Sequence, residues 1–457
     1  MAMTVETGLD RLADAVAFYE PSTCQREVAR LRVADALFSY QQGRALPVAR
    51  LVDDLLGPAS SFSPPTVAFE LAACIRYTEI DDLMLTSCVS PGAIVIPTIL
   101  SIAAMDASGS FDHLLDAAVV GYGVAEWLGG SLDGARAVVR GEWPSRAVAP
   151  LTAALCAGRA LGLDRSGLVD AATLASIWRA DGRLGEPARE LSFARAVSLG
   201  VEAAQATACG VRAHLAASHG RPLDREPPDT PASPTTVFDR AVLDARVKLF
   251  CAARQAMPAL VAVMRALASA GITDPTALEA IELELPEACA AMVDLPRVTT
   301  RVESLRSVQY QLAALLLSPE KLWDLDRSEL PLVPHAEALA PSVSVRAAID
   351  LEAAFPARWP ARATVRAGRA AATVLVADDP PERLDAAYLQ AKQHAFCGKD
   401  MVAGALAAGV LEACVTSKAA GEAWSLVGFI AEATGGEAAK DRQADRPAAR
   451  RRLGPCR

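Results

Sequence analysis

Four ionisable side chains, Arg76, Glu79, Asp81 and Asp82, lie between two apolar segments of the sequence. Burying such groups is costly unless they are paired or used, so this cluster is the first candidate for chemistry. Adjacent carboxylates in a confined site raise each other's pKa, which suits proton abstraction. We therefore interpret Asp82 as a general base, with Asp81 beside it. The alternatives are a solvated loop between two helices, or a carboxylate that caps the next helix.

The segments around this cluster should hold it in place. Ser90-Pro91-Gly92 is a turn signal, because proline fixes its own backbone and glycine allows unusual dihedrals. The following residues, 93–104, are apolar on nearly every side. They predict a central buried helix with the acidic cluster near its start.

Helical periodicity dominates the first two hundred residues. It appears within residues 5–58, and again over residues 111–130, 146–163, 166–180 and 193–214. Residues 220–235 are rich in proline and polar residues and have the composition of a linker. The sequence therefore opens with a large helical region that ends at this linker.

Period-two alternation appears after the linker, over residues 277–285, 343–351, 363–367 and 371–376. Short loops with proline or glycine join several of these segments and favour an antiparallel sheet. Helices return from residue 381, including residues 401–415 and 422–433. We expect a helical domain at 1–235, an α+β lid domain at 236–390, C-terminal helices at 391–435 that pack back on the helical domain, and a disordered tail at 436–457.

The composition excludes several classes of protein. Hydrophobic residues make up 52% of the chain and charged residues 22%, which argues against disorder. The net charge of −9 argues against a general nucleic-acid binder. No apolar run reaches the roughly 18 to 20 residues of a membrane span, and the N-terminus lacks the pattern of a secretory signal. The ten cysteines have no metal-ligand spacing, so we expect reduced thiols, no metal and a cytoplasmic protein.

Four segments, in order, resemble the MmgE/PrpD superfamily, which includes 2-methylcitrate dehydratase and cis-aconitate decarboxylase. They are Asp81-Asp82 followed by Ser90-Pro91-Gly92-Ala93 and IVIPTILSIA, Arg189-Glu190-Leu191-Ser192, Lys248-Leu249-Phe250-Cys251, and Arg306-Ser307-Val308-Gln309-Tyr310. The resemblance implies a mainly α fold with an inserted α+β lid domain, a homodimer, a cofactor-free reaction on a small molecule, and an active site between the two domains.

The family's histidines are missing from this chain. Their places hold Arg76, Met84, Ser90, Trp143, Ser192, Ala253 and Met257, and none of the five histidines present falls on a matched position. The family's dehydration needs a proton donor to help hydroxide leave, and histidine is the usual donor near neutral pH. Either the chain is a catalytically dead partner or scaffold subunit, or its chemistry has changed.

We favour changed chemistry, because sulfate or phosphate leaves as a stable anion and needs no protonation. Such a group needs fixed positive charge and forked donors, which arginine supplies. The predicted function is a base-assisted elimination by a cofactor-independent lyase, which gives either an alkene or, by intramolecular ring closure, a ring. Relatives of this fold that form aziridines in specialised metabolism would be one fit. A conventional hydro-lyase or decarboxylase of a tricarboxylate is the alternative, and a second small subunit is an alternative to the homodimer.

The candidate site residues follow from this hypothesis. Lys248 and Arg189 would hold an anionic group, or form surface ion pairs instead. Tyr310 could bond the substrate or pack in the core, and Trp143 could form a pocket wall. The candidate catalytic residues are Asp82, Asp81, Lys248 and Tyr310, and the candidate substrate-binding residues are Arg76, Glu79, Arg189, Arg254, Trp143 and Ser90. We expect Arg76, Asp82, Arg189, Lys248 and Tyr310 to converge on one pocket.

Overall fold

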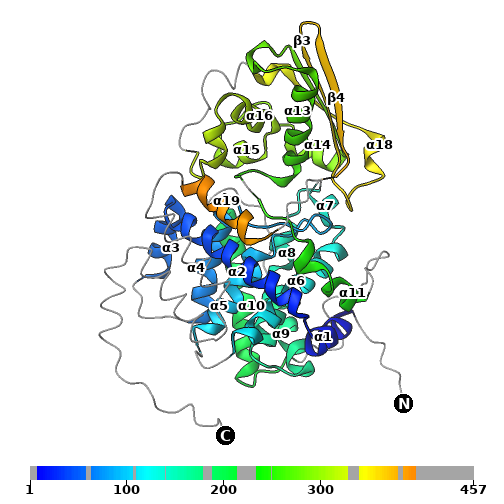
Figure 1. The fold of residues 1–457 in the computed structure, drawn as a ribbon. Helices are drawn as coiled ribbons and strands as arrows, with labels where there is room; N and C mark the ends of the chain where they lie inside the picture. Colours follow the sequence, from blue (N-terminus) through cyan, green and yellow to red (C-terminus); the bar gives the residue numbers. More distant parts are fainter. Residues whose placement is uncertain are drawn as a thin grey trace.

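The chain forms two lobes in a computed structural model, with the smaller lobe stacked on one end of the larger (Figure 1). The structure describes residues 8–57, 63–105, 110–138, 140–178, 188–213, 233–248, 250–327, 339–378 and 384–397. The larger lobe is helical, and the smaller lobe combines helices with one sheet. The predicted fold class, mainly α with an α+β lid, is confirmed.

The helical lobe packs around α5, a helix whose residues are all buried. This helix confirms the predicted central helix at 93–104. Its neighbours α4, α6 and α8 surround it, and α10 lies against α4 and α8. The close approach of α8 and α10 needs glycine, since a Cβ atom at Gly200 would lie 2.3 Å from the carbonyl oxygen of Pro150. The elements of this lobe are α1 (Gly8–Phe18), α2 (Thr23–Arg44), α3 (Pro47–Leu56), α4 (Pro64–Tyr77), α5 (Gly92–Ala103), α6 (Phe111–Ser131), α7 (Gly134–Ala137), α8 (Pro144–Ala160), α9 (Arg165–Trp178), α10 (Ala188–Ala208), α11 (Pro234–Phe238) and α12 (Ala241–Asp244).

The smaller lobe is built on a four-stranded sheet of order β2-β1-β3-β4. Alternate residues of β1 and β3 are buried, and this inner face packs with α13 in the second hydrophobic core. The elements of this lobe are η2 (Arg254–Ala256), α13 (Met257–Ala270), η3 (Pro275–Ala277), β1 (Ala280–Leu285), α14 (Glu287–Val293), α15 (Arg301–Arg306), α16 (Val308–Leu317), η4 (Pro319–Trp323), η5 (Ala340–Ser342), β2 (Val343–Ala347), α18 (Ile349–Glu352), β3 (Ala361–Ala367) and β4 (Ala370–Val376).

The predicted antiparallel sheet is wrong for one pair of strands. β1 pairs with β3 and β3 with β4 in antiparallel fashion, but β1 and β2 are parallel. Helices α14, α15 and α16 lie between β1 and β2 in the chain and provide the crossover that parallel strands require. Only β3 and β4 form a tight hairpin, with Gly368 in the left-handed region at its turn.

Residues around and after position 235, where we expect the domain boundary, still contact the helical lobe. Helix α11 begins at Pro234 and α12 ends at Asp244, and both pack against α6. After β4 the chain returns to this lobe as α19 (Ala386–Cys397), which contacts α2 at the boundary (Figure 1). The predicted helices at 401–415 and 422–433 and the predicted tail lie outside the described residues.

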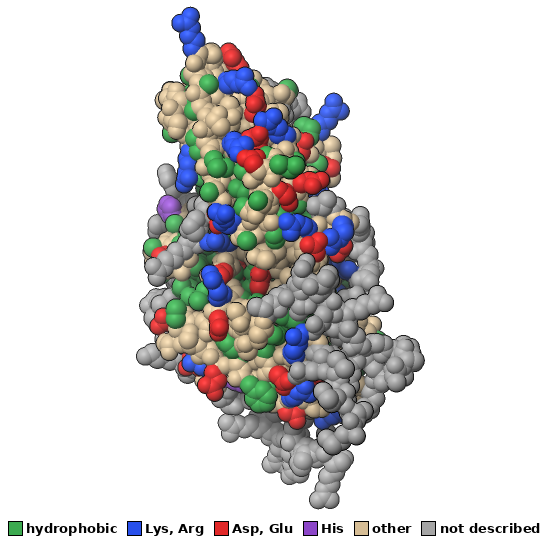
Figure 2. Space-filling model, turned by 90° about the vertical axis from the view of Figure 1, so that its right-hand side faces the viewer, with side chains coloured by type: hydrophobic (Ala, Val, Ile, Leu, Met, Phe, Trp, Pro, Cys, Tyr) green, Lys and Arg blue, Asp and Glu red, His purple; other side chains and the backbone are tan. Residues whose placement is uncertain are grey.

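The visible surface carries charges of both signs. On the face in Figure 2, Lys and Arg side chains alternate with Asp and Glu side chains over both lobes. Several such pairs lie on the outer face of the sheet, including Arg362 with Glu284 and Arg366 with Glu282. Within the described ranges, every helix is too short or too polar to cross a membrane.

Candidate active site

The loop between α4 and α5 carries the predicted acidic cluster. α4 ends at Tyr77, and the loop then forms two backbone bridges, Leu83 with Arg246 and Met84 with Val89. Glu79 adopts a left-handed backbone with φ of 55°, which non-glycine residues rarely do. The loop is therefore held in a defined conformation rather than solvated, and Arg76, Glu79, Asp81 and Asp82 are all at most 7% exposed.

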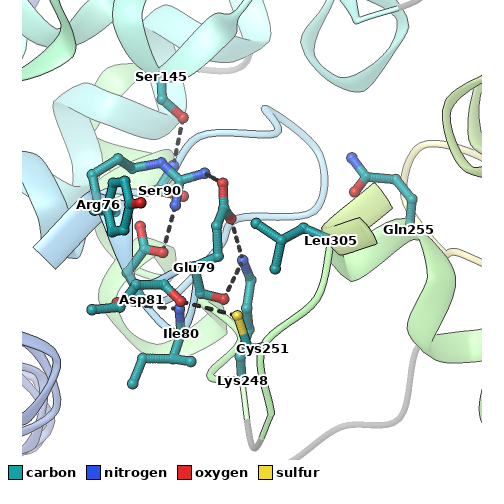
Figure 3. A network of polar contacts seen from close by, with 12 residues as sticks. Arg76, Glu79, Ile80, Asp81, Ser90, Ser145, Lys248, Cys251, Gln255 and Leu305 are labelled. Carbon is teal, nitrogen blue, oxygen red and sulfur yellow. Dashed lines mark hydrogen bonds and ion pairs between the residues drawn. The ribbon is translucent and has the colours of Figure 1, made fainter. Parts of the chain in front are cut away.

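Glu79 is the centre of a buried ionic network (Figure 3). Its Oε1 accepts hydrogen bonds from Arg76 at 2.6 Å and from Arg189 at 2.8 Å. Its Oε2 accepts one from Lys248 Nζ at 3.2 Å, and the same ammonium also donates to the Glu79 carbonyl oxygen. Burial alone would raise the pKa of Glu79, but the charges of Arg76, Lys248 and Arg189 hold this pKa well below its usual range. Glu79 is therefore ionised at neutral pH.

Asp81 shares Arg76 with Glu79 but keeps one oxygen unused. Arg76 donates to Asp81 Oδ1 at 2.6 Å, whereas Oδ2 is buried and makes no hydrogen bond within the described residues. Burial raises the pKa of Asp81, and the charge of Arg76 partly offsets that effect. Asp81 is thus a stronger base than an exposed aspartate.

Ser90 lies on the same side of the loop as Asp81. Its backbone N–H donates to Ser145 Oγ at 3.0 Å, which fixes the start of α5 against α8. The Ser90 hydroxyl is buried and lies close enough to Asp81 for hydrogen bonding to lower the pKa of that carboxyl, although the contact falls short of full hydrogen-bond geometry. Asp81 and Ser90 are therefore neighbours in the site.

Trp143 forms a wall of this site. Its ring stacks on Phe193 with 5.4 Å between ring centroids. The guanidinium carbons of Arg189 and Arg76 lie 4.5 Å and 5.8 Å from the Trp143 ring centroid. These distances correspond to cation–π contacts, so Trp143 helps to orient both arginines.

Arg306 brings a further cation from the smaller lobe. It ends α15, and its Nε is buried without a hydrogen bond to the described residues. Burial lowers the pKa of Arg306, and the charge of nearby Arg189 lowers it further. Four cations (Arg76, Arg189, Lys248, Arg306) thus accompany three carboxylates (Glu79, Asp81, Glu190), with Glu190 at 2.9 Å from Arg189. The charge of Glu303 also acts on Arg306 and raises its pKa, so positive and negative charges in the cluster are close to balance.

Asp82 faces away from this network. Its Oδ1 accepts from the backbone N–H of Gly92 at 2.8 Å, and its Oδ2 accepts from the Tyr122 hydroxyl at 2.6 Å. Arg32 Nη1 lies 3.6 Å from the same Oδ2. Burial raises the pKa of Asp82 to about 6. The carboxylate therefore holds the first turn of α5, as the capping alternative predicts.

Tyr310 and Arg254 occupy other positions. The Tyr310 ring packs with Ala314 and Leu322, and the guanidinium carbon of Arg327 lies 4.8 Å from its centroid. Arg254 is 1% exposed and donates to the carbonyl oxygen of Val247. Of the five residues expected to converge, the structure brings together Arg76, Arg189 and Lys248. It places Asp82 and Tyr310 in separate clusters.

Several residues that position the site carried no signal in the sequence. Lys392 on α19 is fully buried and donates to Asp35 at 2.5 Å and to the carbonyl oxygen of Ile80 at 2.6 Å. Arg32 and Tyr122 hold Asp82 from α2 and α6, and Ser145 holds Ser90. Lys392 lies in a segment that also carries Gln390, Gln393 and His394, so its sequence context gave no sign of its burial. In the described parts of the chain, no group of three or more His, Cys, Asp or Glu is arranged to hold a metal ion.

A separate cavity of about 440 Å³ lies behind the loop. Its lining includes Met84, Thr86, Glu126 and Arg246, and it contains none of the predicted site residues. Ser87 Oγ donates to Glu126 Oε2 at 2.5 Å, and burial raises the pKa of Glu126 to about 7. Glu126 is therefore a second titratable group close to the site loop.

Glu126 should make the stability of the protein depend on pH. Its pKa in the folded protein exceeds the roughly 4.3 expected in the unfolded chain, so the folded state binds the extra proton and stability falls as pH rises from about 4 to about 7. Glu126→Gln should remove this fall and gain about 2 kcal/mol over the wild type at pH 8, allowing for the partial exposure of the side chain. The free energy of unfolding in urea, determined for both proteins at pH 5, 6 and 8, measures this difference. Glu142→Gln, at an exposed ion pair, is the control, and parallel pH curves for wild type and Glu126→Gln would contradict the prediction.

Fold and site together define a two-lobed, mainly helical protein with a buried acid–base cluster under its smaller lobe. Residues 41–222 match the family described as the MmgE/PrpD N-terminal domain, and this match supports membership of the chain in the MmgE/PrpD superfamily. The matched region contains Arg76, Glu79, Asp81 and Arg189, whereas Lys248 and Arg306 lie beyond it. No curated protein matches the chain. Members of the superfamily are generally lyases of the dehydratase type, which supports a lyase-type role.

Proposed function

We propose that this protein is a cofactor-independent lyase that eliminates sulfate or phosphate from a small biosynthetic intermediate. The observation that carries the proposal is the pairing, in one buried site, of the Asp81 carboxylate, whose pKa is raised, with several fixed cations. A base and an anion-stabilising group are the two requirements of such an elimination. A reaction that expels hydroxide would also need a proton donor. Of the two histidines in the described residues, His113 is exposed and bonds the carbonyl oxygen of Ala160, and His394 lies on α19.

Asp81 is the proposed base. Its carboxylate accepts a proton from a substrate C–H, N–H or O–H group. The released electron pair forms a carbon–carbon double bond, or closes a ring when the proton comes from nitrogen or oxygen. The bond between carbon and the sulfate or phosphate oxygen breaks, and its electron pair leaves with the oxyanion. Arg189, Lys248 and Arg306 stabilise the charge that develops there, and Ser90 bonds the substrate beside Asp81.

Substrate classes separate this proposal from its alternatives. Purified protein is incubated with sulfate and phosphate esters of vicinal amino alcohols, with citrate and 2-methylcitrate, and with cis-aconitate. We expect sulfate or phosphate release, measured by ion chromatography, together with an alkene or aziridine product seen by NMR. Arg189→Gln should reduce the release, since it removes one of the cations that face the leaving group.

Other outcomes would contradict the proposal. Dehydration of the hydroxy acids or decarboxylation of cis-aconitate would show a conventional enzyme of the family. A homodimer is the expected assembly for an active enzyme. No turnover of any class, together with a second protein that co-purifies at constant ratio, would show a partner or scaffold subunit.

A further inference from the structure

Three separate elements direct cations at the Glu79 carboxylate. Arg76 comes from the last turn of α4, Arg189 from the first turn of α10, and Lys248 from the segment after α12. All three reach the two oxygens of one side chain within 3.2 Å. Arg76 also contacts Asp81 and Arg189 also contacts Glu190, so Glu79 is the one carboxylate that all three cations share. We call this arrangement the cation cradle.

The loop backbone is strained to place Glu79 in the cation cradle. A left-handed backbone at a non-glycine residue costs on the order of 1 kcal/mol and persists only where surrounding contacts enforce it. Here those contacts include the cations, the Lys248 bond to the Glu79 carbonyl oxygen and the Lys392 bond to the Ile80 carbonyl oxygen. The ion pairs of the Glu79 side chain are thus among several contacts that hold this conformation.

The cation cradle is not sealed. The side chain of Arg189 is 21% exposed and that of Glu79 is 9% exposed, whereas Lys248 is 3% exposed. Arg189 and Trp143 thus lie on the side from which solvent reaches the cluster. A rotation of Glu79 toward that side would leave the three cations without their shared carboxylate.

We propose that Glu79 occupies, in the ligand-free protein, the binding position of a tetrahedral dianionic group such as a sulfate or phosphate ester, and must leave it when that group binds. This inference rests on the proposed function and adds the chemical class of substrate group that the site selects. Three cations match a dianion with three free oxygens better than a carboxylate, and forked guanidinium donors suit such oxygens. Glu79 is then an internal competitor that excludes weakly charged ligands.

Removing the Glu79 side chain should turn the cation cradle into an anion site. Glu79→Gly suits the left-handed backbone and vacates the space, whereas Glu79→Gln removes the charge but still fills the space. We expect inorganic sulfate, titrated by calorimetry at constant ionic strength, to bind Glu79→Gly at least about tenfold more tightly than it binds wild type or Glu79→Gln. Acetate should bind Glu79→Gly more weakly than sulfate does, and adding Arg189→Gln should abolish the gain.

Stability provides a second measurement. Glu79→Gly should show a higher Tm in sulfate than in chloride at equal ionic strength, because a ligand that binds only the folded state stabilises it. Glu79→Asn, which also tolerates a left-handed backbone, repeats the test should the glycine variant be unstable. Equal responses to sulfate and chloride in both variants, or equal affinity for sulfate and acetate, would overturn the inference. Sulfate binding by Glu79→Gly without any ester turnover by wild type would instead refute the proposed function alone.

Discussion

Asp81→Asn should reduce turnover roughly a thousandfold while the protein remains folded. A loss of about this size is usual when a general base is removed. Asparagine has the shape of aspartate and keeps an oxygen for Arg76, so the hydrogen bond at 2.6 Å can persist. It cannot accept a proton at neutral pH. Because burial disfavours the charge of Asp81, the neutral amide should not destabilise the fold strongly. Steady-state release of the leaving group, with circular dichroism as the test of folding, measures the effect.

The control for Asp81→Asn is a carboxylate outside the site. Asp112 forms an ion pair with Arg30 and its side chain is 55% exposed. Asp112→Asn should retain wild-type turnover. A folded Asp81→Asn variant with more than about a tenth of wild-type activity would show that Asp81 is not the general base.

Asp82→Ala should destabilise the protein by about 3 to 4 kcal/mol, because it removes the acceptor of two buried hydrogen bonds and the carboxylate of one buried ion pair. The N–H of Gly92 and the hydroxyl of Tyr122 would lose their bonds, and the guanidinium of Arg32 its nearby carboxylate. Since all of these groups lie in the core of the helical lobe, water cannot replace the lost oxygens easily. The free energy of unfolding in urea measures the loss.

Asp82→Asn is the matched comparison. Its amide oxygen can still accept from Gly92, so we expect a smaller loss of stability and turnover within about tenfold of wild type. The pKa of Asp82 is raised to about 6, above its value in the unfolded chain, so wild type loses stability as pH rises from about 4 to about 6. The difference between wild type and Asp82→Asn should therefore narrow over that range. Complete loss of turnover in folded Asp82→Asn would show that Asp82, rather than Asp81, is the general base.

Local patterns in the sequence predicted the elements well. Apolar periodicity located α5, α6 and α8, and alternation located the four strands, because these patterns follow directly from which face is buried. The parallel pairing of β1 and β2 could not be predicted in this way. Both strands alternate in any pairing, and their relative direction depends on the long crossover that contains α14, α15 and α16.

The sequence predicted which residues make up the candidate site, but not which of them contact one another. The sequence showed that Arg76, Glu79, Asp81 and Asp82 lie together, and the resemblance added Arg189 and Lys248. Adjacent residues on a loop point in different directions, so no spacing rule separates Asp81, which faces the cations, from Asp82, which faces α5. Arg306 lies near Arg189 but comes from the smaller lobe, and Lys392 contacts Ile80 from far along the chain, so one sequence does not reveal either relation.

The ammonium of Lys392 supports the Ile80 carbonyl oxygen across 312 positions of the chain. During synthesis, the loop with Glu79 and Asp81 leaves the ribosome long before this support exists. The helical lobe can therefore collapse early, but the loop lacks its contact with α19 until that helix has been made. Premature termination before residue 392 would leave the Ile80 carbonyl oxygen without the Lys392 ammonium, so the candidate site is completed late in translation.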